Sequence, residues 1–172
     1  IAGSTKIDAS WSASGGSLEL DVPLEADTPI WDEFHPELQH LTVTLRDPAR
    51  HSVDHSTLTF GLREVTARDK DLLINGRVVN LRTTHFGGDF PLTGYPAMDV
   101  EAWKKIIRTC QDFGLNGMRF HSWCPPEAAF VAADELGFYL QPELGLWVPF
   151  SPGSVYTKYM EEETPRLLRA YG

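Results

Sequence analysis

The spacing of apolar residues changes near Asn80, and this change constrains the fold more than any other feature of the chain. Before Asn80, apolar and polar residues alternate in short segments: residues 17–22 read SLELDV, residues 41–45 read LTVTL and residues 56–62 read STLTFGL. A period of two is typical of strands with one buried face. Several such strands, separated by turn residues, predict an antiparallel β-sandwich, which we expect to lack one or two strands at its N-terminus.

A tight turn is predicted at Asn75 and Gly76, between the apolar residues 72–74 and 78–81. An Asn-Gly pair favours a type I′ turn because both central residues must adopt a positive φ. Residues 71–74 and the residues after Gly76 should therefore form a β-hairpin.

After Asn80, predicted strands and helices alternate. The expected strands are residues 78–84, 115–120 and 138–140, and the expected helices are residues 100–113, 127–136 and 156–171. Asp99 suits the N-cap of the first helix, while Gly114 and Gly137 suit the ends of the first and second helices. Three strand–helix units with short connections indicate a parallel sheet with right-handed crossovers. The sheet is either small and open or the start of an eight-stranded barrel, and we favour the truncated barrel.

Charge and composition exclude several functional classes. The chain has 15 Lys and Arg against 24 Asp and Glu, a net charge of −9, which argues against binding to a nucleic-acid backbone. No run of 18 apolar residues is present, so we expect no membrane span. Cys110 and Cys124 lack the spacing of a metal site and are predicted to be unpaired thiols.

The ends of the predicted parallel strands carry the residues that suit a binding site. They are His85, Arg119, His121, Ser122, Trp123 and Glu143. Ligands of parallel α/β folds bind at the C-terminal ends of strands, and a sugar suits this mixture because Trp stacks on a pyranose while Arg and His bind hydroxyls or a carboxylate. Some of these residues could have a structural role instead. Arg119 could form an ion pair with Glu143 or Asp134, and Trp123 could fill the rim of the barrel.

Other residues are expected to be structural. Trp31, Trp103, Phe113 and Phe130 are candidates for the core, and residues 161–163 (EEE) suit the solvated first turn of the last helix. The histidines of the first half share no strand face, so we assign them no metal.

Several ordered motifs resemble glycoside hydrolase family 2, which includes β-galactosidases, β-glucuronidases and β-mannosidases. They are TPIWDEFHPEL at residues 28–38, TFGLREV at 59–65, LLINGRVVNLR at 72–82, NGMRFHSW at 116–123 and ADELGFYLQPE at 133–143. The resemblance extends from about residue 28 to residue 172. It implies an immunoglobulin-like β-sandwich over residues 1–77, followed by the first three βα units of a truncated (β/α)8 TIM barrel over residues 78–172.

The resemblance also implies roles for the strand-end residues. Arg119 matches the sugar-binding arginine of the family and Glu143 its third-strand carboxylate, which holds magnesium in some members; we expect no magnesium or other cofactor here. His85 lies where members often have a histidine. The family's Ser-His order is reversed in this chain, so His121 is displaced by one position. With Trp123, these residues form the expected substrate-binding set.

The implied activity is that of a retaining β-glycosidase, similar to β-galactosidases, which hydrolyses O-glycosidic bonds of an oligosaccharide or glycoside. Such enzymes use two carboxylates, and in this family the acid/base follows an Asn. The chain has no Asn-Glu pair, so we expect it to contain neither catalytic carboxylate and to be inactive alone. We also expect an exposed edge of the barrel to pair with a second copy. A role in polysaccharide breakdown is typical of periplasmic or secreted bacterial enzymes, although no residue assigns a compartment.

Two alternatives stay open. One is a non-catalytic carbohydrate-binding or interaction module that uses the sandwich. The other is a metal-dependent hydrolase with His85, His121 and Glu143 as ligands, although it lacks the His-x-His pair that such barrels usually carry.

Overall fold

A computed structural model describes residues 4–47, 49, 51–145, 147–149 and 151–171. The outermost residues of the two expected domains, 1–3 and 172, lie outside the described residues.

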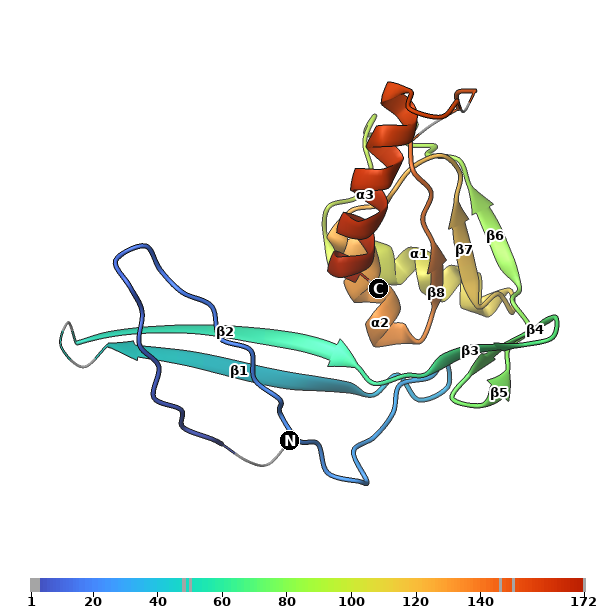
Figure 1. Ribbon diagram of the computed structural model, residues 1–172. Coiled ribbons are helices and arrows are strands. Elements are labelled where there is room, and N and C mark those ends of the chain that lie inside the picture. Colours follow the sequence, from blue (N-terminus) through green and yellow to red (C-terminus); the bar gives the residue numbers. More distant parts are fainter. Residues whose placement is uncertain (1–3, 48, 50, 146, 150, 172) are drawn as a thin grey trace.

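The first half is built from antiparallel strands. Strands β1 (Leu38–Asp47) and β2 (Ser52–Gly61) pair along their full length in a ribbon that projects away from the helices (Figure 1). A small second sheet joins β3 (Val65–Arg68), β4 (Asp71–Ile74) and β5 (Arg77–Val78) in that order. These strands confirm the expected antiparallel segments from residue 41 onward.

The turn between β4 and β5 confirms the prediction made from Asn75 and Gly76. Their φ angles are 51° and 74°, so both central residues are left-handed, as a type I′ turn requires. Asn75 also accepts a hydrogen bond from the Glu64 N–H at 2.9 Å and donates to the Trp31 carbonyl at 3.0 Å. The turn therefore fixes two neighbouring segments as well as the hairpin.

The prediction of a strand at residues 17–22 is wrong. These residues have no regular secondary structure, and Leu18, Leu20 and Val22 are all exposed. Alternation of apolar residues gives a strand only where a neighbouring strand accepts its backbone hydrogen bonds, and no described strand pairs with this segment.

The second half confirms the three strand–helix units. They are β6 (Thr83–Phe86) with α1 (Val100–Asp112), β7 (Gly117–Phe120) with α2 (Glu127–Leu136), and β8 (Tyr139–Gln141) with α3 (Val155–Tyr171). The strands form a parallel sheet in the order β6-β7-β8, and the described residues form no closed barrel.

The helix ends are set by the residues that the sequence indicated. The Asp99 carboxylate accepts a hydrogen bond from the Ala102 N–H at 2.8 Å at the start of α1. Gly114 ends this helix with φ 76°, and Gly137 ends α2 with φ 69°. None of the described helices is long and apolar enough to cross a membrane.

The single strand expected at residues 78–84 is divided into β5 and β6. Asn116 explains the break, because its side chain takes the place of a strand partner. Its amide oxygen accepts from the Arg82 N–H at 2.7 Å, and its amide nitrogen donates to the Asn80 carbonyl at 3.1 Å. Asn116 is only 6% exposed, so the intervening backbone bends around a buried polar group.

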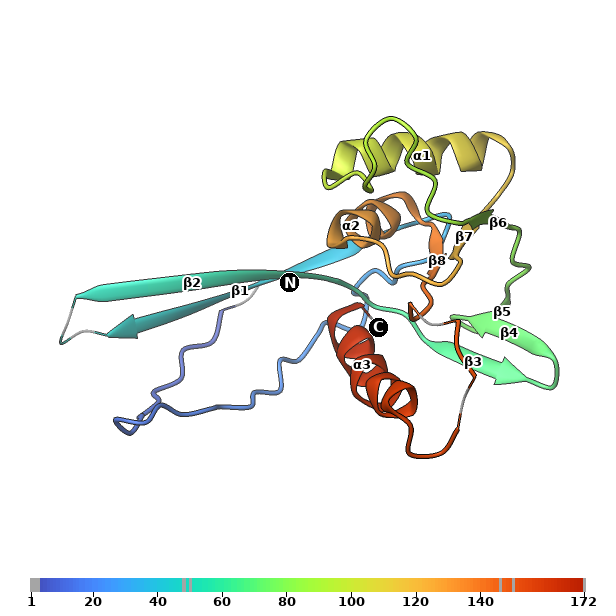
Figure 2. The ribbon, with the colours of Figure 1, turned by 90° about the horizontal axis from the view of Figure 1, so that it is seen from above.

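The main core lies between the parallel sheet and the helices α1 and α2. Figure 2 shows α1 and α2 beside one face of this sheet and α3 beyond the β8 edge, where its Tyr171 ring stacks on Phe130 of α2. Four alanines of α2 allow the close packing of these layers. The buried apolar residues of this core are Trp103, Ile107, Met118, Phe120, Ala128, Ala129, Ala132, Ala133 and Phe138.

Three expectations for structural residues need correction or refinement. Phe113 is 81% exposed because it is the C-cap residue, where the chain turns out of α1. Phe130 lies outside the main core and stacks on Tyr171 at 3.9 Å, which joins α2 to α3. Residues 161–163 lie in the middle of α3, since the helix begins at Val155, and they are therefore not its first turn.

Trp31 joins the two halves of the chain. Its side chain is buried, and the indole N–H donates to the carbonyl oxygen of Asp134 in α2 at 2.7 Å. The Tyr139 ring meets the indole edge-on at 5.8 Å, while the Arg63 guanidinium carbon lies 5.5 Å from its ring centre. The confirmed core residue Trp31 thus contacts the first and the second half together.

Glu33 extends this junction along the starts of β7 and β8. Its carboxylate lies 3.6 Å from the Arg77 guanidinium and accepts from the Asn116 amide at 3.3 Å. Its carbonyl oxygen faces Gly137, where a Cβ atom would lie 2.5 Å away. Only glycine permits this approach, since two backbone segments meet there.

We predict that Gly137→Ala lowers the free energy of unfolding more than Gly114→Ala does. Both glycines end a helix with a left-handed φ, which costs alanine about 1–2 kcal/mol. A Cβ at Gly114 meets nothing within 4 Å, whereas at Gly137 it meets the Glu33 carbonyl. Urea unfolding of both variants measures the difference, and equal losses would contradict the close approach.

Candidate functional site

One face of the parallel sheet gathers the expected site residues. In β7, Met118 and Phe120 point into the core against the helices. Because side chains alternate along a strand, Arg119 and His121 share the opposite face. His85 pairs with Arg119 in the parallel register and lies on that face too. Three of the five predicted residues are therefore brought together where β6 and β7 end.

Glu143 joins this group from the segment after β8. One of its carboxylate oxygens, Oε1, accepts a hydrogen bond from Nε of Arg119 at 2.6 Å and lies 2.5 Å from Nη2 in an ion pair. The other, Oε2, accepts from the Ser122 N–H at 2.8 Å. The structural alternative for Arg119, an ion pair with Glu143, is what the structure shows.

The segment after β7 is fixed by Glu143 at two points of the backbone. The Glu143 N–H donates to the Trp123 carbonyl at 3.1 Å, while its side chain holds the Ser122 N–H. Ser122 has φ 63°, an uncommon left-handed conformation for serine. The hydrogen bond from Ser122, followed by the Arg119 guanidinium, holds the pKa of the Glu143 carboxyl below its usual value.

The two imidazoles and an indole form an aromatic group on the same face. The ring centres of His85 and His121 are 5.0 Å apart, and that of Trp147 lies 5.6 Å from His121. A pocket of about 580 Å³ opens beside them. Its lining consists of Gly87, Gly88, Phe90, His121, Ser122, Trp123 and Trp147.

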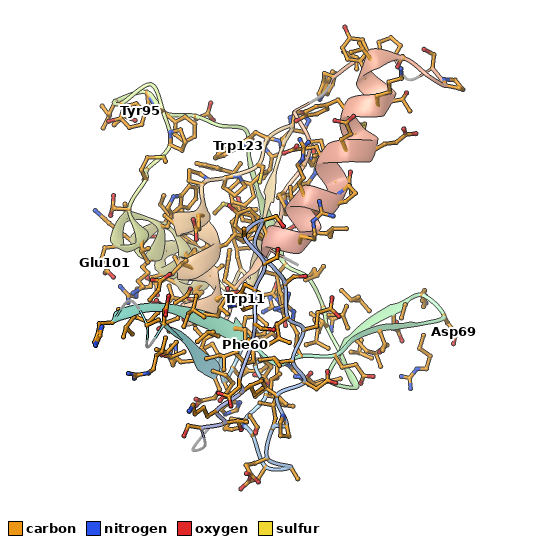
Figure 3. All side chains as sticks on the ribbon, turned by 60° about the vertical axis from the view of Figure 1, so that its left-hand side comes forward. Trp11, Phe60, Asp69, Tyr95, Glu101 and Trp123 are labelled. Carbon is orange, nitrogen blue, oxygen red and sulfur yellow. The ribbon has the colours of Figure 1, made fainter. Side chains whose placement is uncertain are left out.

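Trp123 has both a structural and a lining role. Its indole N–H donates to the Phe86 carbonyl at 3.1 Å, and its ring packs against Phe120 at 5.1 Å and Phe90 at 5.5 Å. The residue thus fills the end of the core, and only part of its surface faces the pocket. In Figure 3, Trp123 lies at the end of the helical part remote from Phe60 and the β1–β2 ribbon.

The donor set does not fit magnesium at Glu143. Magnesium prefers oxygen ligands, yet both carboxylate oxygens here face donors, namely the Arg119 guanidinium and the Ser122 N–H. Within the described part of the chain, no three His, Cys, Asp or Glu side chains form a group that could hold a metal. The structure therefore gives the alternative of a metal-dependent hydrolase with His85, His121 and Glu143 no support.

Sequence analysis missed Trp147, Gly88 and Phe90 as parts of the site, and it placed Ser122 at the strand end without including it in the substrate-binding set. Gly88 has φ 83°, and a Cβ there would face the Trp123 indole at 3.7 Å. The Gly87-Gly88 pair after the first strand was a usable signal for a close approach. No comparable signal in the sequence marks Trp147, because it follows β8 in a segment without periodicity. Its side chain is 80% exposed.

Comparisons with known proteins found similarity to glycosidases. No protein-family model matches the chain. The chain is 28% identical over 116 residues to a β-galactosidase of Staphylococcus xylosus, and this match covers 66% of the chain but 11% of the relative. The chain thus spans only a small part of the curated relative.

Solved structures agree with this likeness. A β-glucuronidase of Parabacteroides merdae superimposes with a TM-score of 0.65 at 26% identity, over 78% of this chain and 16% of that one. A family 2 β-galacturonidase of Eisenbergiella tayi gives a TM-score of 0.59 at 25% identity, over 72% and 21% of the two chains.

We predict that the Ser122 amide signal titrates with a midpoint below the ordinary pKa of glutamate. The lowered pKa of Glu143 means that its contacts stabilise the folded segment at neutral pH and are lost as the pH falls through the lowered value. Nuclear magnetic resonance of the amide between pH 2 and pH 7 measures this midpoint. In Arg119→Gln the midpoint should rise, because a cation that stabilises the carboxylate is gone, and an unchanged midpoint would contradict the ion pair.

Proposed function

We propose that this chain, a fragment similar to glycoside hydrolase family 2, supplies a substrate-binding wall of a retaining β-glycosidase that hydrolyses O-glycosidic bonds. Similarity to a β-galactosidase in sequence and to a β-glucuronidase in fold supports the reaction class. The proposed site contains His85, Arg119, His121, Trp123 and Glu143. Oligosaccharides or glycosides are the proposed substrates of the complete enzyme.

The observation that carries this proposal is the single sheet face on which three polar residues meet beside a pocket. His85, Arg119 and His121 share the face, and the pocket of about 580 Å³ lies at the carboxyl end of the strands. A pyranose needs both an aromatic surface and groups that bind its hydroxyls. Trp147 provides the first, and the two imidazoles provide the second.

The same resemblance supports a division of the chain into two domains. We propose that residues 1–77 belong to an immunoglobulin-like β-sandwich and residues 78–172 to the first three βα units of a (β/α)8 barrel. The antiparallel sheets of the first half and the β6-β7-β8 order of the second half agree with that division.

Sugar binding by the isolated chain tests the proposed site. Titration with methyl β-D-galactopyranoside should change the tryptophan fluorescence, and Trp147→Ala should weaken binding roughly tenfold, the size of a 1.4 kcal/mol loss. Trp11→Ala is the matched control, because Trp11 is also exposed but belongs to the irregular N-terminal segment. Equal effects of the two substitutions, or no binding at all, would contradict a site at Trp147.

We propose that both catalytic carboxylates are absent from this sequence, so that the chain alone has no catalytic activity. We expect no release of nitrophenol from aryl β-galactosides or β-glucuronides by the purified chain above the rate in buffer. Removing either carboxylate of such a pair raises the barrel enzyme's activation barrier by many kcal/mol. Measurable turnover that survives repurification would refute the assignment.

We further propose that the free edge of β8 mediates self-association. Among the described strands only β7 pairs with β8, and a pocket of about 490 Å³ lies beside this edge. Its lining includes Phe138 and Leu140 near the strand and Leu167 and Leu168 on α3. Unpaired edges beside apolar surface are a common cause of pairing between chains.

Light scattering across a tenfold range of concentration tests this proposal. We predict that the average mass rises toward that of a dimer and that Leu168→Glu reduces the rise, because it places a charge in the pocket. Val155→Glu is the matched control on the same helix, where the side chain is also exposed but does not line the pocket. A constant monomer mass would refute self-association.

A further inference from the structure

We propose that Gly88 opens an apolar notch in the pocket and that this notch receives a methyl group of the bound sugar. The notch is the space in front of Gly88 that is bordered by Phe90 and Trp123. The proposed substrate class is therefore a pyranose with a methyl substituent, either a 6-deoxy sugar or an N-acetyl sugar. This inference rests on the proposed carbohydrate site and adds to it the substituent that the site selects.

The notch exists because residue 88 has no side chain. Gly88 lines the pocket and has φ 83°, in the left-handed region that favours glycine. A Cβ atom there would lie 3.7 Å from Nε1 and 3.9 Å from Cε2 of Trp123, and 3.8 Å from Cε2 of Phe90. These are ordinary van der Waals distances, so one methyl-sized group fits in contact with both rings.

The notch has no free hydrogen-bond partner in its aromatic walls. Apart from the two adjacent residues, the three atoms nearest to the Cβ position are two ring carbons and Nε1 of Trp123. The Nε1 hydrogen is already donated to the Phe86 carbonyl at 3.1 Å, and that carbonyl also accepts the His121 N–H at 3.0 Å. A hydroxyl placed here would lose its water without gaining a partner from these walls, whereas a methyl group gains contact with two rings.

The walls of the notch are held in place before any ligand binds. The ring centre of Phe90 lies 5.5 Å from that of Trp123 and 5.9 Å from that of Phe86. The Phe90 carbonyl also accepts the Gly94 N–H at 2.8 Å, which fixes the loop that carries it. A preformed wall costs little ordering on binding, so the contact with a methyl group contributes to affinity.

The polar side chains of the pocket belong to another part of its lining. His121 and Ser122 follow the end of β7, and the ring centre of Trp147 lies 5.6 Å from that of His121. Imidazole and hydroxyl groups can bind the hydroxyls of a sugar, and an indole covers the apolar face of a pyranose. The lining therefore separates a part that suits the ring hydroxyls from a notch that suits one apolar substituent.

The experiment compares four free sugars with the same ring configuration, each titrated into the intact chain and followed by tryptophan fluorescence. Free sugars are used because the O-methyl group of a methyl glycoside could itself enter the notch. D-fucose carries a methyl group where D-galactose carries a hydroxymethyl group, L-arabinose carries only hydrogen there, and N-acetyl-D-galactosamine carries its methyl group on the 2-acetamido substituent.

We expect the wild-type chain to bind one of the two methyl-bearing sugars about tenfold more tightly than D-galactose, the size of effect that a methyl group has in a hydrophobic pocket. A preference for D-fucose assigns the notch to a 6-deoxy sugar, and a preference for N-acetyl-D-galactosamine assigns it to an N-acetyl sugar. L-arabinose should not share the preference, because it lacks both the hydroxyl and the methyl group.

Three variants connect the preference to the notch. Gly88→Ala places a Cβ atom in the notch and should reduce the affinity ratio to about one, a loss of about tenfold. Gly88→Asn should do the same with less backbone strain, because asparagine tolerates a left-handed φ. Gly94→Ala is the matched control: Gly94 has φ 75° on the same loop, but a Cβ there meets nothing within 4 Å, so the ratio should stay as in the wild type.

The outcomes distinguish this inference from the proposed function. If none of the four sugars binds the wild-type chain, the carbohydrate site itself is refuted. If they bind and neither methyl-bearing sugar is preferred, or if L-arabinose is preferred equally, the site stands and the methyl notch is refuted. A preference that survives in both Gly88 variants, or one that Gly94→Ala abolishes as well, would also overturn the role of Gly88.

Discussion

The burial of Trp31 is the contact on which the arrangement of the chain depends. The indole lies between the antiparallel half, through Arg63, and the helical half, through the Asp134 carbonyl and the Tyr139 ring. Its N–H would be costly to bury without that carbonyl. Glu33, two residues later, packs against Gly137, so this contact also holds the start of β8. The parallel strands all run away from it in one direction.

Parallel strands that start side by side also end side by side. The carboxyl ends of β6, β7 and β8 therefore meet at the far end of the sheet, where the site lies. The strands themselves are short, so their ends need additional fixing. Glu143 provides it through Arg119, Ser122 and the Trp123 carbonyl, which connect the segments after β7 and β8. One carboxylate residue therefore fixes both segments at the end of the sheet.

Local signals predicted the elements of the second half well. Asp99, Gly114 and Gly137 define helix ends through hydrogen bonds and φ angles that depend only on neighbouring residues, and all three were read correctly. Strands in the first half were less predictable, since a strand needs a partner that alternation cannot supply; residues 17–22 alternate and are not a strand. The break near Asn116 was likewise invisible, because it depends on a side chain more than 30 residues away in the sequence.

The reversed His-Ser order shows how the site depends on the backbone as well as on residue type. Residue 121 continues the alternation of β7, with its N–H bonded to the Phe86 carbonyl, so an imidazole there shares the face of Arg119. Residue 122 is the left-handed residue that turns the chain and gives its N–H to Glu143. Exchanging the two would place the imidazole on the turn and remove it from the face of Arg119. The order found in this chain thus keeps the imidazole beside His85 and leaves the turn to the smaller side chain.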